Sequence, residues 1–154
     1  MDMQVSEQAG FTLVELMVTI AIVAILATIA VPSFSELTAS QRVKAAASNL
    51  HISILRARSE AIKRNESIEL VPVGGDWAKG WVIQNRTDPI VVLERHAQIG
   101  NAIISGPASI RYRSSGRLAD TSAAGFSISA SGTSSQRCVS VSLSGQPVSK
   151  KGAC

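Results

Sequence analysis

The sequence has little cysteine, little histidine and no positive charge near its start. Its 154 residues include two cysteines and two histidines. The histidines, His51 and His96, are far in sequence from both cysteines, so no metal-binding set is indicated. We therefore expect neither a metal ion nor another cofactor. The motifs G-x-S-x-G, H-E-x-x-H, the P-loop and the glycine-rich dinucleotide fingerprint are also missing, so we do not expect an enzyme.

The charges are distributed unevenly. All 15 Lys and Arg residues lie at or after Arg42, whereas four acidic residues precede it. From Arg42 onward 15 basic residues therefore face 7 acidic ones, a net charge of +8. A basic globular region favours anionic partners such as nucleic acid or lipid headgroups, although many basic surfaces are only solvated ones.

Residues 11–31 form a long apolar run, FTLVELMVTIAIVAILATIAV, with Glu15 as its single charge. Its length matches a helix that crosses a bilayer core of about 30 Å. A buried core helix is disfavoured because the run is apolar on every face. A cleaved signal peptide is disfavoured because no Lys or Arg precedes the run, and the small residues Ala9 and Gly10 lie before it.

Beyond Pro32 the pattern becomes amphipathic. Apolar residues recur every three or four positions, at Val43, Ala47, Leu50, Ile54, Ala57 and Ala61. We expect one kinked helix over 11–63, whose second half packs against a globular domain. The expected segments are a leader at 1–10, a transmembrane helix at 11–33, an amphipathic helix at 34–65 and a β-rich domain at 66–154.

After Arg64 the periodicity approaches two, which is typical of short strands. We expect strands at 67–71, 80–84, 90–94, 109–113, 125–130 and 138–143, in an antiparallel arrangement. The predicted fold class is thus α+β, with a long N-terminal helix packed on a small antiparallel sheet domain. Serines such as Ser129, Ser131 and Ser134 are expected on the solvent face.

The two cysteines, Cys138 and Cys154, lie in the last stretch of the chain. In an oxidising compartment they are expected to form a structural disulfide that fixes the C-terminal tail. Free thiols in a cytosolic protein are the alternative. The apolar N-terminal segment favours the disulfide.

The segment GFTLVE, which runs from Gly10 to Glu15, resembles the processing motif of type IV prepilins and type II secretion pseudopilins. The resemblance implies that a prepilin peptidase cleaves after Gly10 and methylates the new amino terminus on Phe11. That ammonium would lie four residues from Glu15 on the same helical face. In a filament Glu15 would instead meet the amino terminus of a neighbouring subunit. A Glu near the membrane edge with no such role is the alternative.

Three further segments resemble GspH/FimT/FimU-type minor pilins. They are LRARSEAIKR at 55–64, WAKGW at 77–81 and IRYRSSGR at 110–117. We expect Trp77 and Trp81 to be core anchors flanking a tight turn; a carbohydrate or base platform is the alternative. The resemblance implies a minor pilin that helps initiate or cap a pilus. It would be single-pass in the bacterial inner membrane with a periplasmic C-terminal domain, and would then join other major and minor pilins in the filament. A minor pseudopilin of a type II secretion system is the alternative.

Some FimT-like proteins bind DNA through a G-R-x-R motif between the two cysteines. This sequence has GQPVSKK at 145–151 instead. Basic residues that could contact the phosphates of double-stranded DNA are Arg111, Arg113, Arg117, Arg137, Lys150 and Lys151. A solvated basic face is the competing interpretation.

Overall fold

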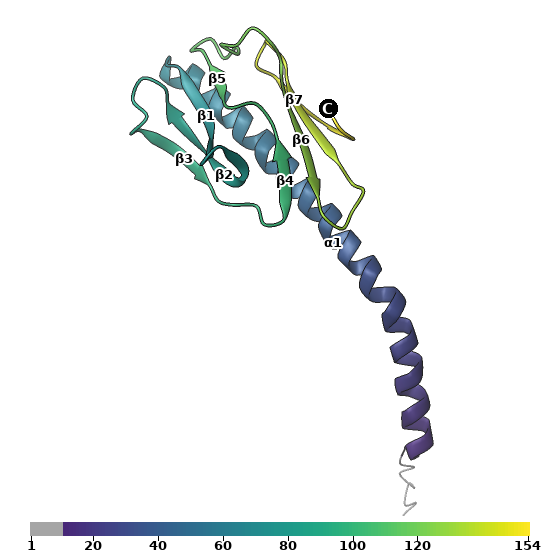
Figure 1. Cartoon of the computed structure of the whole chain (residues 1–154). Coiled ribbons are helices and arrows are strands. Elements are labelled where there is room, and N and C mark those ends of the chain that lie inside the picture. The colour runs from purple at the N-terminus through teal and green to yellow at the C-terminus, as the bar shows by residue number, and fades with distance from the viewer. Residues whose placement is uncertain (1–10) are drawn as a thin grey trace, which may run out of the picture. The chain divides into compact units, whose positions relative to one another are not determined.

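A computed structural model describes residues 11–154 of the chain (Figure 1). The predicted leader at 1–10, with Gly10, lies outside the described residues. The chain divides after Ser35 into two units, the second of which is Glu36–Cys154. We refer to Glu36–Cys154 as the head.

Helix α1 (Leu13–Arg64) has 52 residues and contains Pro32. The single helix expected over 11–63 is therefore confirmed, with both ends shifted slightly. Hydroxyl groups in the apolar part bond within the helix: Thr19 and Thr28 donate to the carbonyls of Leu16 and Ile25, at 2.8 and 2.7 Å. These two bonds satisfy the hydroxyl donors of Thr19 and Thr28 within the helix, as an apolar environment requires.

The second half of α1 buries one stripe in the head. Val43, Ala47, Leu50, Ile54, Ala57 and Ala61 are all at most 1% exposed, which confirms the amphipathic pattern. Three of these residues are alanines, and small side chains let the sheets approach the helix closely. The stripe joins side chains from both sheets in one hydrophobic core.

The first sheet, sheet A, has four antiparallel strands in the order β3-β2-β1-β5. Its strands are β1 (Ile68–Val73), β2 (Asp76–Asn85), β3 (Val92–His96) and β5 (Ile110–Tyr112). Inward residues of β1 and β5, such as Ile68 and Tyr112, are fully buried.

The second sheet, sheet B, is also four-stranded and antiparallel, in the order β4-β6-β7-β8. Its strands are β4 (Ala102–Ser105), β6 (Ala124–Ala130), β7 (Arg137–Val141) and β8 (Pro147–Lys151). In β6 the residues Phe126, Ile128 and Ala130 are buried, while Ser127 and Ser129 face outward. Alternation with period two thus places the serines on the solvent side.

The tryptophans occupy one strand, which corrects the expected tight turn between them. Trp77 and Trp81 both belong to β2, and Gly80 between them has φ of 101°. A Cβ at Gly80 would lie 2.3 Å from the His96 carbonyl oxygen, so the strand needs glycine there. The tryptophans are core anchors, as expected: both are buried, and Trp77 meets Phe126 edge-on with ring centroids 4.9 Å apart. That burial excludes a ligand-stacking platform.

Candidate assembly site

The first turn of α1 is built around Thr12 and Glu15. The Glu15 backbone N–H donates to the Thr12 hydroxyl oxygen at 3.2 Å, so Thr12 caps the helix. The spacing Thr-x-x-Glu is that of a capping box, and a carboxylate in the first turn is also favoured by the helix dipole. Thr12 was not among the predicted site residues, although this spacing is visible in the sequence.

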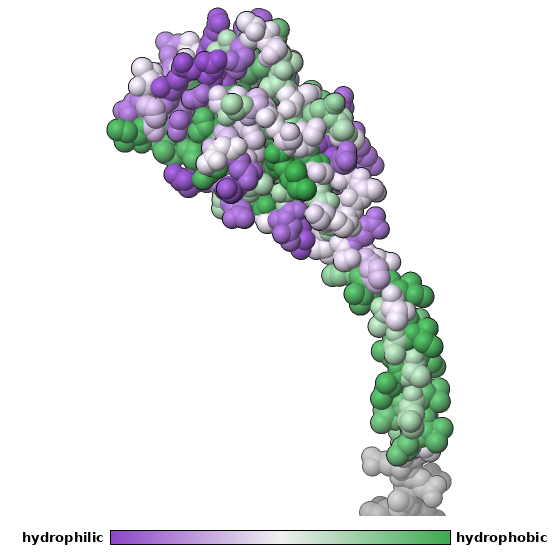
Figure 2. Space-filling view, viewed as in Figure 1, coloured by the Kyte–Doolittle hydropathy of each residue, from purple (hydrophilic) through white to green (hydrophobic). Residues whose placement is uncertain are grey.

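The part of α1 before Glu36 is apolar on all sides. The large apolar side chains are exposed throughout this part and in Phe11 just before it, at 83% for Phe11 and 70% for Phe34. Figure 2 shows hydrophobic side chains covering this segment on the face in view. Within residues 11–154, α1 is the one helix that is long and apolar enough to cross a membrane. A large exposed apolar surface of this kind marks a site of interaction with a membrane or with other proteins.

The second half of α1 is fastened to the turns of both sheets by Arg58. Its Nε donates to the Gly116 carbonyl at 3.0 Å, and one terminal nitrogen donates to Gln146 Oε1 at 2.9 Å. The turn that contains Gly116 and the turn that contains Gly145 are also in direct contact with each other. A Cβ added at Gly145 would lie 2.1 Å from the Gly116 carbonyl oxygen, and the Tyr112 hydroxyl donates to the Gly145 carbonyl at 3.1 Å. Burial raises the pKa of Tyr112, so this hydroxyl keeps its proton.

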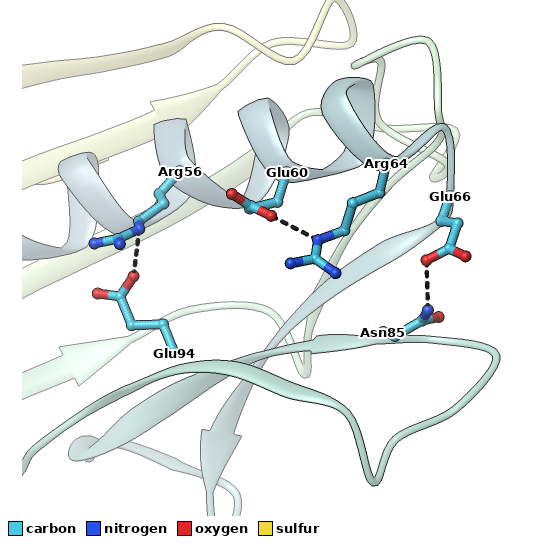
Figure 3. A network of polar contacts seen from close by, with 6 residues as sticks. All are labelled: Arg56, Glu60, Arg64, Glu66, Asn85 and Glu94. Carbon is cyan, nitrogen blue, oxygen red and sulfur yellow. Dashed lines mark hydrogen bonds and ion pairs between the residues drawn. The ribbon is translucent and has the colours of Figure 1, made fainter.

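A polar network joins the end of α1 to sheet A (Figure 3). Arg56 Nε lies 2.8 Å from Glu94 Oε2 on β3, and Asn85 of β2 donates to Glu66 at 2.7 Å. Arg64 donates to Glu60 one turn earlier at 2.6 Å. This hydrogen bond holds the pKa of Glu60 below its usual range.

The predicted DNA-contacting residues lie in two groups. Arg111, Arg113 and Arg117 belong to β5 and the turn after it, and Arg111 is paired with Asp120. The other three residues, Arg137, Lys150 and Lys151, lie at the open end of the β7–β8 hairpin. The closed end of that hairpin is the one that contacts Gly116. Three residues of β8, Pro147 to Ser149, thus lie between Lys150 and the closed end of the hairpin, about 10 Å at about 3.3 Å per residue.

The predicted disulfide is confirmed. Cys138 of β7 is bonded to Cys154, with 5.0 Å between their Cα atoms. The bond fixes the tail that follows β8. Among residues 11–154, no group of three or more His, Cys, Asp or Glu side chains is arranged to hold a metal ion.

Comparison with known protein families identifies two regions of the chain. Residues 6–31 match the prokaryotic N-terminal methylation motif, and residues 46–145 match the family described as type II transport protein GspH. The chain belongs to the GspH family. With the methylation motif, this membership identifies it as a protein of the minor pilin and pseudopilin class. The motif and the exposed apolar helix together indicate a membrane anchor.

Individual relatives agree with this assignment. Two fimbrial proteins of Pseudomonas aeruginosa are each 44% identical to the chain over 54 residues, 35% of this chain and 34% of theirs. The chain thus spans about a third of the length of the curated relatives it matches.

Two solved structures share the fold. The type IV minor pilin FimU of P. aeruginosa matches with a TM-score of 0.63 at 20% identity, over 74% of this chain and 96% of that one. The minor pseudopilin EpsH of Vibrio cholerae matches with a TM-score of 0.54 at 14% identity, over 73% and 97% of the two chains. The predicted α+β, pilin-like fold class is confirmed.

Proposed function

We propose that this GspH-family chain is a minor type IV pilin, a structural subunit that helps initiate or cap pilus assembly and has no catalytic activity. The observation that carries the proposal is the apolar half of α1, whose side chains are exposed and whose first turn holds one carboxylate, Glu15. Such a surface suits lipid first and the packed helices of a filament afterwards.

Processing prepares this segment for assembly. A prepilin peptidase cleaves after Gly10 and methylates Phe11, which leaves an ammonium one residue before the Thr12 cap. The chain is then anchored in the bacterial inner membrane with its head in the periplasm. The Cys138–Cys154 disulfide supports that orientation, because disulfides persist in oxidising compartments.

Glu15 acts as the docking carboxylate. A charged side chain in the bilayer costs about 2.5–3.5 kcal/mol on insertion scales, so Glu15 needs a cationic partner. In the single subunit that partner is its own amino terminus, four residues away. In the filament Glu15 pairs with the amino terminus of a neighbouring major or minor pilin, which sets the axial register while the apolar helices pack.

The test is the amount of pili sheared from a strain that lacks the protein. Complementation with the wild type should restore piliation. Glu15→Gln should leave it reduced about tenfold or more, because a neighbour's ammonium would lose its partner in hydrocarbon. Glu36→Gln is the matched control, since it removes an exposed acid from the same helix beyond the apolar run. Immunoblots of membranes should show equal amounts of all three proteins. Equal piliation by Glu15→Gln and Glu36→Gln would contradict the docking role.

A minor pseudopilin of a type II secretion system is the second candidate. The family description and the fold likeness to EpsH favour it. Secretion of exoproteins by the same deletion strain separates the two functions. Normal pili with lost secretion would assign the chain to the secretion machinery, and lost pili with normal secretion to the pilus.

Double-stranded DNA remains a predicted partner of the basic residues rather than part of this proposal. The separation of the two basic groups and the Arg111–Asp120 pair both weaken a continuous phosphate track.

A further inference from the structure

A hollow of about 400 Å³ in the head brings three cations together. Lys44 enters it from α1, Arg137 from the start of β7 and Lys151 from the end of β8. These residues are far apart in sequence, so only the folded head unites them. Lys44 and Lys151 are exposed, and Arg137 is half-buried.

Two of the three cations are opposed within sheet B. Arg137 and Lys151 are direct cross-strand partners in the antiparallel β7–β8 ladder. Directly opposite residues project from the same face, and like charges in this arrangement destabilise a sheet. Lys150 is the partner of Cys138, one position along, and therefore projects from the other face.

Among residues 11–154, no acidic side chain forms an ion pair with any of these three cations. The ion pairs among the described residues involve other side chains: Arg56 with Glu94, Arg64 with Glu60 and Arg111 with Asp120. No Asp or Glu follows Asp120 in the sequence, and the four strands of sheet B contain none. Three cations that converge without a counter-charge form a site for an external anion.

The remaining lining favours an oxyanion with several acceptor oxygens. Ser40, Ser134 and Ser135 bring hydroxyl donors to the hollow. Its walls are held in place, because the Gly152 N–H donates to the Gln136 carbonyl at 3.0 Å and Cys154 is tied to Cys138. Cations and hydroxyls arriving from three directions suit a tetrahedral phosphate better than a planar carboxylate.

We propose that this hollow binds a single phosphate group, with Arg137 and Lys151 on one side of it and Lys44 on another. The phosphate belongs either to an anionic lipid headgroup or to a free phosphate. Ser40 and Lys44 follow Pro32 by 8 and 12 positions in α1, so the site lies early in the head, soon after the apolar segment. The assignment does not depend on whether the chain serves a pilus or a secretion system.

The test uses the full chain in a nonionic detergent, with thermal unfolding followed by tryptophan fluorescence. Inorganic phosphate at about ten times its Kd, at constant ionic strength set with chloride, should raise the Tm of the wild type by about 4 °C. Arg137→Gln and Lys151→Gln should abolish this rise. Each should also raise the Tm without phosphate at low salt, because the cross-strand repulsion is removed. Lys150→Gln is the matched control and should retain the phosphate response.

Tm measurements with lipid micelles identify the source of the phosphate. Mixed micelles that contain phosphatidylglycerol should reproduce the Tm rise if the ligand is a lipid headgroup, whereas micelles with phosphatidylcholine should not. A response to inorganic phosphate alone assigns the site to a free phosphate. The proposal is overturned if phosphate has no effect, if Lys150→Gln loses the response as fully as Lys151→Gln, or if only a DNA duplex stabilises the chain.

Discussion

Before Glu36, the apolar side chains of α1 cover every face of the helix and are exposed; after it, one apolar stripe is buried in the core, whereas Ile52, Leu55 and Ile62 off that stripe are exposed. The polar side chains of the two halves differ as well. In the first half, Thr19 and Thr28 donate hydrogen bonds to the backbone of the helix itself. In the second half, arginine side chains bind the turns of both sheets and strand β3. An amphipathic helix can pack its apolar stripe against a domain, whereas a uniformly apolar helix needs apolar surroundings on every face, such as lipid or other helices. The comparison predicts that equal substitutions in the two halves have unequal effects.

The largest contrast is expected from removing one leucine in each half. Leu50→Ala should lower the free energy of unfolding of the head by about 2–5 kcal/mol, because Leu50 is fully buried in the core. Leu26→Ala should change it by less than about 0.5 kcal/mol, because Leu26 is 60% exposed. Urea unfolding of the full chain in detergent, followed by tryptophan fluorescence, measures both. Equal losses would show that the two halves unfold as one unit.

Arg58 tests how the second half of the helix holds the turns. Arg58→Ala removes two hydrogen bonds and leaves the Gly116 carbonyl without this donor, at an expected cost of about 2 kcal/mol. Gln146→Ala removes only the exposed bond and should cost about 0.5 kcal/mol. The same urea titration compares the two variants. A larger loss of stability in Gln146→Ala than in Arg58→Ala would mean that contacts within the turn, and not the hydrogen bonds of Arg58, hold this part of the head.

Thr12 tests the start of the first half. Thr12→Ala should cost about 1 kcal/mol of local helix stability, because the Glu15 N–H loses its cap. Faster hydrogen exchange at the amides of the first turn, measured by NMR in micelles, would report the fraying, and Thr12→Ser should prevent it. The unfolding of the head should not change.

The smallest effect concerns Glu60 and Arg64. The folded-state pKa of Glu60 lies below the unfolded value near 4.5, so their pairing stabilises the head above that pH and is lost as the pH falls through the lowered pKa. The pair is partly exposed and should contribute about 0.3–0.5 kcal/mol. Glu60→Gln should therefore flatten the stability profile slightly below pH 5, about where the carboxyl protonates. A profile identical to that of the wild type would mean that other carboxyls dominate.

Much of the fold follows from local patterns, and the misses have physical causes. The buried stripe of α1 and the alternation in β6 are visible in the sequence, because one face of each is apolar. Strand β4, with four residues, and strand β8, which begins with proline and carries two lysines, lack that pattern. Tertiary contacts hold both of them: pairing with β6 for β4, and pairing with β7 plus the disulfide for β8.

Of the candidate sites, one could be predicted from the sequence and the other could not. The motif from Gly10 to Glu15 is contiguous, so its resemblance could be recognised without a structure. The meeting of Lys44, Arg137 and Lys151 depends on the register of the β7–β8 ladder and on the packing of α1. No spacing in the sequence encodes that meeting. The sequence therefore predicted Arg137 and Lys151 as members of a larger basic face and did not include Lys44.

The position and sequence of strand β8 affect how closely neighbouring heads can be packed without aggregating. It is an edge strand of sheet B, whereas the opposite edge, β4, packs beside β2. Unpaired edge strands recruit strands from other molecules and so seed aggregation. Proline at the first position of β8 and two lysines at its end are residues that discourage such pairing. Heads held close together at high local concentration would then remain separate instead of joining edge to edge into a continuous sheet.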